Sequence, residues 1–430
     1  MPLRLQSALG LASLLLLAWL LSERRRSVSW RFAATGVLVQ FALALLLLKT
    51  PFATAVFGAV NRGVLALQGA TQAGSTFVFG FLGGGPLPYI ETRPGASIAF
   101  AFRFLPLVIV ISALATLLTY WRVLPAIIKV LASLFGRLLG LGGAAALASV
   151  ASPFLGMVES SILVRPYIER LTRSEIFIVM CVGLAGIAGT VLVLYSTLLA
   201  PIVPNAAGHL LVASVLALPI AIVIARIIIP ETEPPTPGDL ELPDVHGSVD
   251  AVMLGTRQGL ALFLNIVATL LVFIALVSLC DSLLGLLPSV GGQALTLERL
   301  FAWLFSPIAW LIGVPWSEAP TFASLLGTKT VLNELVAYTN LSGLPPGALS
   351  ERSRLLATYA LCGFANFGSI GILVSGLATM APKRSAEIAK LGSTSSLVRG
   401  RRTSATSENG YRECAPWPTH TPAHRALQAP

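Results

Sequence analysis

Two glutamates stand beside stretches of sequence that are almost entirely apolar. Glu159 follows the small-residue run 139–157, and Glu334 follows residues 305–327, which proline and glycine interrupt. A charged side chain at the centre of a bilayer costs roughly 2.5–3.5 kcal/mol even on insertion scales, so it persists where it is paired, hydrated or functional. We therefore interpret both glutamates as candidate binding groups. An ion pair with a neighbouring arginine is the alternative.

Asn366 and Ser369 flank a Phe-Gly pair in a third apolar stretch. Taken alone, they are best explained by hydrogen bonds between helices, which are worth about 0.6 kcal/mol each. The sequence has no zinc-protease, serine-hydrolase or phosphate-loop motif, so it predicts neither an enzyme nor a metal or cofactor site. Without a nucleotide-hydrolysing module, any transport must be driven by an ion gradient or by downhill flow.

The composition is that of an integral membrane protein. Of 430 residues, 55% are hydrophobic and only 11% are charged, whereas soluble proteins carry about 25% charged residues. Stretches long enough to cross a bilayer recur along the chain, and lipid offers their backbones no hydrogen-bond partners, so they must be helical. The clearest lie at about 8–22, 32–49, 98–119, 175–200, 207–229, 258–280 and 353–381. The predicted fold class is all-α integral membrane, with many membrane passes.

The net charge of +10 is explained without a nucleic-acid partner. Residues 383–430 hold eight Lys/Arg and three Asp/Glu, which accounts for half of it. Much of the rest lies in loops that the positive-inside rule assigns to the cytoplasm, such as those with Arg24, Lys129 and Arg173.

Two broken apolar segments, 139–157 and 305–327, predict re-entrant hairpins, because interrupted backbone at membrane depth is tolerated only beside a protein-enclosed cavity. Each is followed by a glutamate, a Ser/Arg cluster and an apolar helix with small or polar interruptions. The charge pattern makes the first hairpin enter from inside and the second from outside. Such inverted repeats point to the midplane site of a secondary transporter. Chance similarity between two short helix starts is the alternative.

The expected organisation has five parts. Listed in order, they are N-terminal peripheral transmembrane helices (1–120), a first transport repeat with its hairpin (121–230), an acidic, proline-rich cytoplasmic linker (231–250), a second transport repeat with its hairpin (251–392) and a disordered polar tail (393–430). The tail carries several arginines and no long apolar run, so it is not expected to cross the membrane.

Several motifs resemble those of the concentrative nucleoside transporter family, the bacterial-type nucleoside:cation symporters. They are Gly156-Met157-Val158-Glu159, Arg165-Pro166-Tyr167, Leu171-Thr172-Arg173-Ser174-Glu175, Gly327-Thr328-Lys329, Asn333-Glu334-Leu335-Val336-Ala337-Tyr338 and Tyr359-Ala360-Leu361-Cys362-Gly363-Phe364-Ala365-Asn366-Phe367. The resemblance runs from about Trp30 to Gly392. It implies a homotrimer in the bacterial inner membrane, with a nucleoside held in each protomer between two hairpins and two unwound helices.

The resemblance also implies roles for individual residues. Gly156, Met157, Val158 and Glu159 would face the base. Glu334, Asn366 and Ser369 would bind the ribose hydroxyls, and Phe364 would lie beside the sugar.

This sequence departs from the family's pattern at two places. The usual Gly-Gln-Thr-Glu-Ala-Pro is replaced by Gly-Met-Val-Glu-Ser-Ser from Gly156 onward, which removes two polar side chains and favours purine over pyrimidine nucleosides. The family's final transmembrane helix is replaced by the polar tail.

A third difference from the family's pattern bears on which ion drives transport. Sodium-coupled members use Asn and Ser side-chain oxygens at positions that are Ser152 and Gly186 here. Because Gly186 offers no side-chain oxygen, the resemblance predicts proton coupling, carried by a carboxylate. Sodium-coupled symport, and a non-transporting receptor or scaffold with the same fold, are the alternatives.

Overall fold

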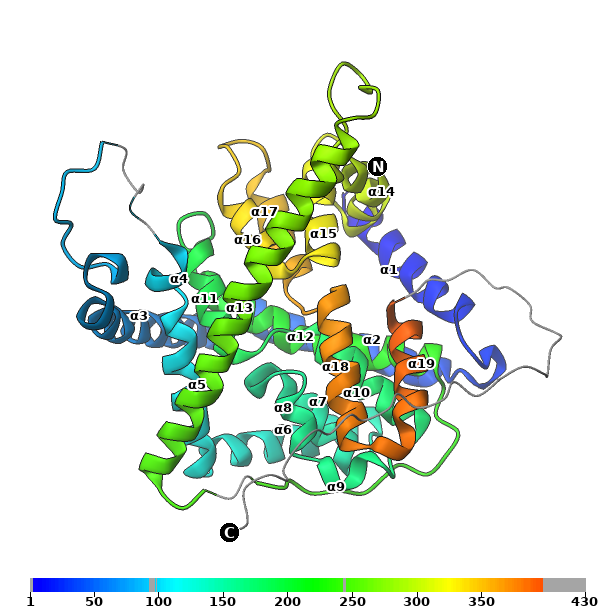
Figure 1. Cartoon of the computed structure of the whole chain (residues 1–430). Helices are drawn as coiled ribbons and strands as arrows, with labels where there is room; N and C mark the ends of the chain where they lie inside the picture. The colour runs from blue at the N-terminus through cyan, green and yellow to red at the C-terminus, as the bar shows by residue number, and fades with distance from the viewer. Residues whose placement is uncertain (1–2, 93–96, 98, 243–244, 397–430) are drawn as a thin grey trace, which may run out of the picture. The chain divides into compact units, whose positions relative to one another are not determined.

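The computed structural model describes residues 3–92, 97, 99–242 and 245–396, and in these ranges every regular element is a helix (Figure 1). In chain order the α-helices are α1 (Leu3–Leu20), α2 (Trp30–Lys49), α3 (Pro51–Phe79), α4 (Phe100–Arg103), α5 (Pro106–Tyr120), α6 (Val123–Leu139), α7 (Gly143–Leu155), α8 (Glu159–Ile162), α9 (Arg165–Ile168), α10 (Arg173–Ala185), α11 (Gly189–Leu199), α12 (Ala206–Ile228), α13 (Ser248–Leu284), α14 (Leu297–Ile312), α15 (Ala319–Val331), α16 (Glu334–Ser342), α17 (Glu351–Leu361), α18 (Phe367–Met380) and α19 (Ser385–Ser396). Short 3₁₀ helices are η1 (Arg25–Ser27), η2 (Gly80–Gly83) and η3 (Pro382–Arg384).

Five helical stretches within the described residues are long and apolar enough to cross a membrane. They are α2, α4–α5, α10–α11, α12 and α13. Each coincides with a segment expected from the sequence, so the all-helical membrane fold class is confirmed. The 29-residue helix α3 was not expected, because Asn61, Arg62 and two glutamines interrupt its apolar pattern.

The helices follow the same order twice. A long apolar helix (α5 or α13) precedes an amphipathic helix (α6 or α14), then two helices joined at a short break (α7–α8 or α15–α16), then a helix broken in its middle (α10–α11 or α17–α18). The two leading helices, α5 and α13, run side by side (Figure 1). Glycine permits this approach, because a Cβ at Gly255 would lie 2.6 Å from the Cα of Ala113.

The structure corrects where the predicted hairpins break. Of the residues expected to interrupt them, Pro153 and Pro307 lie inside helices, whereas Gly313 and Pro315 lie in the break between α14 and α15 and Pro320 stands in the first turn of α15. The first break begins at Gly156, whose φ of 118° favours glycine, and the second precedes Glu334 at Leu332–Asn333. The second pair therefore extends to Ser342, beyond the expected 305–327. An interior proline removes one N–H donor and crowds the carbonyl four residues earlier, which can kink a helix without ending it.

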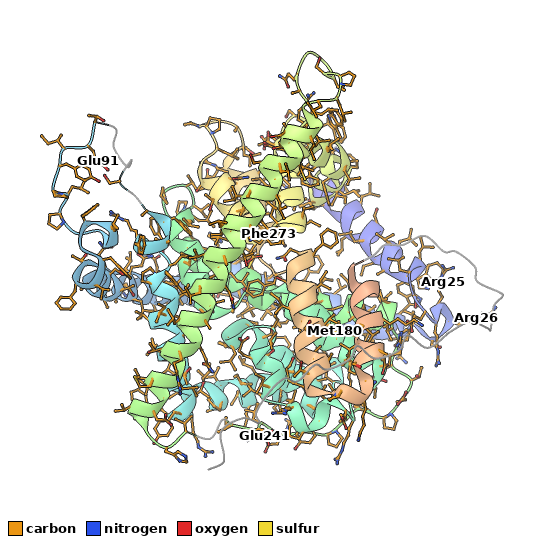
Figure 2. All side chains as sticks on the ribbon, in the orientation of Figure 1. Arg25, Arg26, Glu91, Met180, Glu241 and Phe273 are labelled. Atoms are coloured by element: carbon orange, nitrogen blue, oxygen red, sulfur yellow. The ribbon has the colours of Figure 1, made fainter. Side chains whose placement is uncertain are left out.

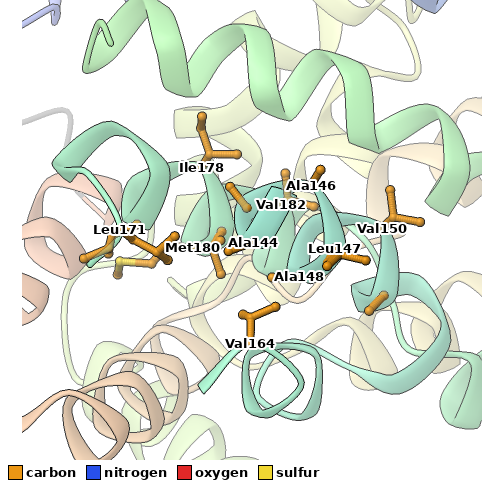
Figure 3. Packing of buried hydrophobic residues seen from close by; sticks show 14 of the residues in the cluster. Ala144, Ala146, Leu147, Ala148, Val150, Val164, Leu171, Ile178, Met180 and Val182 are labelled. Atoms are coloured by element: carbon orange, nitrogen blue, oxygen red, sulfur yellow. The ribbon is translucent and has the colours of Figure 1, made fainter. Parts of the chain in front are cut away.

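Two separate hydrophobic cores organise these elements. The first includes residues of α6, α7, α10, α18 and α19, and the second includes residues of α5, α11, α15, α16 and α17. In the first core, the small residues Ala144, Ala146 and Ala148 let α7 lie close to Met180 and Val182 of α10 (Figure 3). Each mid-broken helix therefore contributes one half to each core, and its break lies where the cores meet.

The two mid-helix breaks cross each other. The Phe364 N–H, between α17 and α18, donates to the Gly186 carbonyl, between α10 and α11, at 3.2 Å. Gly363 makes the approach possible, because a Cβ there would lie only 2.6 Å from the Ala185 carbonyl oxygen and 3.0 Å from that of Leu184. The crossing thus satisfies backbone groups that the breaks release.

The linker between the two halves is tied to the first half. The fully buried Glu175 accepts hydrogen bonds from the Thr172 N–H at 3.0 Å and the Thr236 N–H at 2.9 Å. Further along, the Glu241 N–H donates to the Leu163 carbonyl at 2.8 Å, and Glu241 is labelled in Figure 2. We call residues 231–241 the linker strap.

The tail begins later than expected. Helix α19 extends to Ser396, four residues into the segment 393–430 that was predicted to be disordered. The reason is packing: Leu391 is fully buried, and Gly392 abuts Val374 of α18, so the helix continues for a further turn. Residues 397–430, on which the other expectations about the tail fall, lie outside the described residues.

Gly363→Ala is expected to lower the melting temperature of the purified protein, because its methyl group would collide with two carbonyls and such overpacking costs about 1–3 kcal/mol. Gly371→Ala in α18 is the matched control, since nothing lies within 4 Å of a Cβ there. Equal melting temperatures for the two variants would contradict the crossing.

Candidate functional site

Glu334 is the centre of a buried polar cluster where the two cores meet. Glu334 is the first residue of α16, and it is only 5% exposed. The Tyr195 hydroxyl donates to Oε1 at 2.7 Å, and the Asn366 amide donates to Oε2 at 3.2 Å. The carboxylate is therefore held by α11 and by the start of α18, so both of its oxygens have a donor.

Asparagine side chains fix the two helix starts beside this carboxylate. The Asn366 Oδ1 accepts the Ser369 N–H at 2.8 Å and so caps α18, while its amide nitrogen donates to Glu334. Asn333 caps α16 in the same way, accepting the Val336 N–H at 2.9 Å. Asn caps are favoured because the side-chain oxygen satisfies a backbone donor that the helix start leaves free. Asn366 thus has two tasks, as a cap and as a partner of Glu334.

A lysine and a tyrosine complete the cluster from the second half. The Lys329 ammonium donates to the Ala360 carbonyl at 2.9 Å, near the end of α17, and attracts Glu334 electrostatically. The Tyr338 ring lies 5.0 Å from that of Tyr195, and its hydroxyl donates to the Thr358 carbonyl at 2.9 Å. These contacts bind α15, α16 and α17 into one unit around the carboxylate.

The break between α7 and α8 brings a second set of expected residues toward both mid-broken helices. A Cβ at Gly156 would lie 3.6 Å from Ala188, which precedes α11. Met157 approaches Gly183 of α10, and Val158 approaches Gly376 of α18. Met157 and Val158 therefore pack partly against neighbouring helices.

Glu159 differs from Glu334 in its surroundings. Its side chain is exposed, and its carboxylate folds back over Gly156 and accepts N–H groups from Val158 and from its own backbone. The sequence left open that Glu159 forms an ion pair with a neighbouring arginine. The ion pairs found among the described residues join other side chains. No ion pair among the described residues therefore holds the Glu159 carboxylate.

Of the two positions assigned to an ion, Gly186 stands at the break after α10 and Ser152 lies in the last turn of α7. Ser152 is buried in α7, and its carbonyl accepts the Gly156 N–H at 2.9 Å. The Gly186 carbonyl accepts the Phe364 N–H. Both backbone oxygens therefore already have a protein donor.

A cavity of about 590 Å³ reaches the cluster from the side of α10, α12 and α18. Its walls are mostly apolar and include Ala185, Tyr359, Cys362 and Asn366. The Tyr359 hydroxyl lies 3.1 Å from Nδ1 of His209 in the first turn of α12. Of the residues expected to bind ribose, Asn366 is the one that this cavity reaches.

The structure brings together Glu334, Asn366 and Ser369 as expected, and adds partners that the sequence analysis missed. Lys329 was named in a family motif without a role, and Tyr195 was not named, because their helices meet Glu334 only after folding. A lysine and a tyrosine hydroxyl in apolar segments are costly in lipid, and that cost was an available signal. Breaks that cross around a buried carboxylate are the architecture of a secondary transporter.

Comparison with known proteins agrees with that class. Family profiles described as the N-terminus and C-terminus of Na⁺ dependent nucleoside transporters match residues 9–82 and 209–407, and one described as nucleoside recognition matches 101–202. The uncharacterized transporter YutK of Bacillus subtilis is 37% identical over 89% of this chain and 93% of its own. The nucleoside permease NupC of Helicobacter pylori is 31% identical over 91% and 93%.

Solved structures of a protein named CNTnw share the fold. Its inward-facing, substrate-bound structure is 37% identical, with a TM-score of 0.83 over 92% of this chain and 97% of that one. An outward-facing variant gives a TM-score of 0.85 over 92% and 94%. This chain belongs to the concentrative nucleoside transporter family. It is a membrane transporter of nucleosides, not an enzyme.

Tyr195→Phe is expected to destabilise the protein while preserving its fold. The substitution leaves Glu334 Oε1 without its 2.7 Å donor, and a buried polar group left unsatisfied costs about 1–3 kcal/mol. The measurement is the melting temperature of the purified protein. Tyr89→Phe, at a side chain that is 49% exposed, is the control, and an equally small effect of both would refute the assigned bond.

Proposed function

We propose that this transporter takes up nucleosides across the bacterial inner membrane, and that Glu334 and Asn366 bind the ribose. The observation that carries the proposal is the buried cluster of carboxylate, amide and hydroxyl groups at the crossed breaks. A ribose offers hydroxyl donors to a carboxylate and both donors and acceptors to an amide. Ser369 and Phe364, on either side of Asn366, complete the sugar site.

The base is proposed to lie against Gly156, Met157, Val158 and Glu159 at the first break. Two of these side chains are apolar, so a large flat purine gains contact area there without needing two side-chain hydrogen bonds. The exposed Glu159 carboxylate is the polar group available to the base edge. Adenosine and inosine should therefore compete for uptake better than uridine and cytidine.

Proton coupling is the proposed energy source. A hard cation needs a full oxygen shell, and of the two expected positions Ser152 offers only a hydroxyl while Gly186 has no side-chain oxygen. A proton needs only a carboxylate, and Glu159 and Glu334 both supply one. Sodium coupling is the competing candidate, because the matched family profiles are described as Na⁺ dependent.

The proposed organisation keeps the expected order of parts, with the second repeat extended through α19 to Ser396 and with the hairpins at α7–α8 and α15–α16 entering the membrane part-way. A homotrimer is proposed as the working form. The 37-residue α13 supports it, since many of its apolar side chains, including Leu264, Leu271 and Leu279, are exposed in the protomer.

Glu334→Gln and Asn366→Ala are each expected to abolish nucleoside uptake at unchanged surface expression. Removing one partner of a buried polar contact leaves the other unsatisfied, at a cost of about 1–3 kcal/mol, or more for a charged group. Uptake of radiolabelled adenosine and uridine in transport-deficient cells is the measurement. Glu298→Gln and Asn340→Ala, both at exposed positions, are matched controls. Near-normal uptake by either site variant would overturn the ribose assignment.

Uptake is expected to rise when the outside medium is acidified and to stop when a protonophore is added. The same cells assayed with sodium replaced by choline at constant pH should transport equally well. A strict requirement for sodium together with indifference to the protonophore would decide for sodium coupling.

A further inference from the structure

Helix α6 has three distinct faces. Its buried side chains are Leu124, Pro125, Ile128, Ala132, Phe135 and Leu139. A second set is apolar yet exposed: Val123, Ile127, Val130, Leu134 and Leu138. At 100° per residue these two sets lie on different sides of the helix, and Lys129, Ser133 and Arg137 form a third, polar edge between them. A helix with one face on the protein, one apolar face exposed and a basic edge fits the surface of a bilayer.

The basic edge borders a hollow of about 370 Å³. Lys129, Ser133 and Arg137 line it from α6, and the start of α7 lines it with the small residues Gly143 and Ala146. The linker strap closes the far side with Gly238 and Asp239. Helix α6 contains no acidic residue, so its side of the hollow attracts anions.

One acidic side chain already occupies part of this site. Asp239 forms an ion pair with Lys129 at 2.8 Å, and both side chains are more than half exposed. The hydrogen bond from Lys129 lowers the pKa of Asp239, so Asp239 remains ionised at neutral pH. Arg137 has no such acidic partner among the described ion pairs, which leaves the hollow with one uncompensated positive charge.

We propose that the hollow binds the phosphate headgroup of an anionic phospholipid whose acyl chains cover the exposed apolar stripe of α6, and that Asp239 competes with the headgroup for Lys129. The linker strap would then respond to lipid composition, because occupancy releases Asp239. This site is separate from the nucleoside site and does not depend on how uptake is coupled.

The corresponding helix of the second half lacks the available basic edge. Helix α14 also exposes apolar side chains, including Trp303 and Leu304. Its one arginine, Arg299, donates instead to the carbonyls of Val290, Gln293 and Ala294, and Glu298 lies beside it. Exposed apolar surface is therefore common to both helices, whereas an available basic edge is a property of α6.

Native mass spectrometry of the full-length protein, titrated with phosphatidylglycerol or with phosphatidylcholine of the same acyl chains, tests the proposal. Phosphatidylglycerol should bind in preference. A basic residue near an anionic lipid surface contributes about a fivefold effect, so the Lys129→Gln/Arg137→Gln double variant should lose about 25-fold in affinity for it. Asp239→Asn should gain affinity, because Lys129 loses its competitor.

Lys383→Gln is the matched control: it removes one charge from a side chain that is 84% exposed and outside the hollow, and it should leave lipid affinity unchanged. Equal binding of the two lipids, or weaker phosphatidylglycerol binding by Asp239→Asn, would overturn the proposal. Displacement of the lipid by excess inorganic phosphate would identify a soluble-anion site instead and overturn the assignment to lipid. The Asp239→Asn arm retains an intact α6, so it decides the question even if the double variant fails to fold.

Discussion

A helix that breaks inside lipid leaves N–H and C=O groups for which the lipid has no partners. The protein itself must therefore supply hydrogen-bond partners for these groups. Each unsatisfied group costs several kcal/mol in hydrocarbon. Here the two mid-helix breaks satisfy each other in part, because the Phe364 N–H donates to the Gly186 carbonyl. Asparagine side chains cap the helices that restart beyond the breaks before α16 and α18. The side chains that satisfy the helix starts, Asn333 and Asn366, are therefore also polar groups of the site.

The same crossing explains why the site lies between two cores. Since α10 and α18 belong to the first core while α11 and α17 belong to the second, neither core encloses the breaks by itself. Glu334 bonds to Tyr195 within the second core and reaches across the boundary to Asn366, which opens α18. Small residues set the distance of closest approach at several of these contacts, at Gly363 above all. A ligand held here would touch parts of both cores at once.

The sequence predicted the membrane class, most spans and the polar residues of the site, because a carboxylate or an amide in an apolar run is visible without a structure. It placed the break at Gly313 and Pro315 correctly, but it also took Pro153 and Pro307 as interruptions, and both lie inside helices. It also missed α3, whose polar residues mask its apolar pattern. Tyr195 could not be assigned to Glu334 from sequence, because 139 residues separate them and only tertiary packing joins them.

The linker strap sets a mechanical limit. Glu241 is bonded to the first half, and α13 begins only seven residues further, at Ser248. A fully extended chain spans at most about 3.6 Å per residue, so this stretch can reach about 25 Å and no more. While the strap holds, the foot of α13 cannot separate from Leu163 beyond that length. The linker therefore limits how far the start of α13 can move away from Leu163 in any conformational change that leaves this hydrogen bond intact.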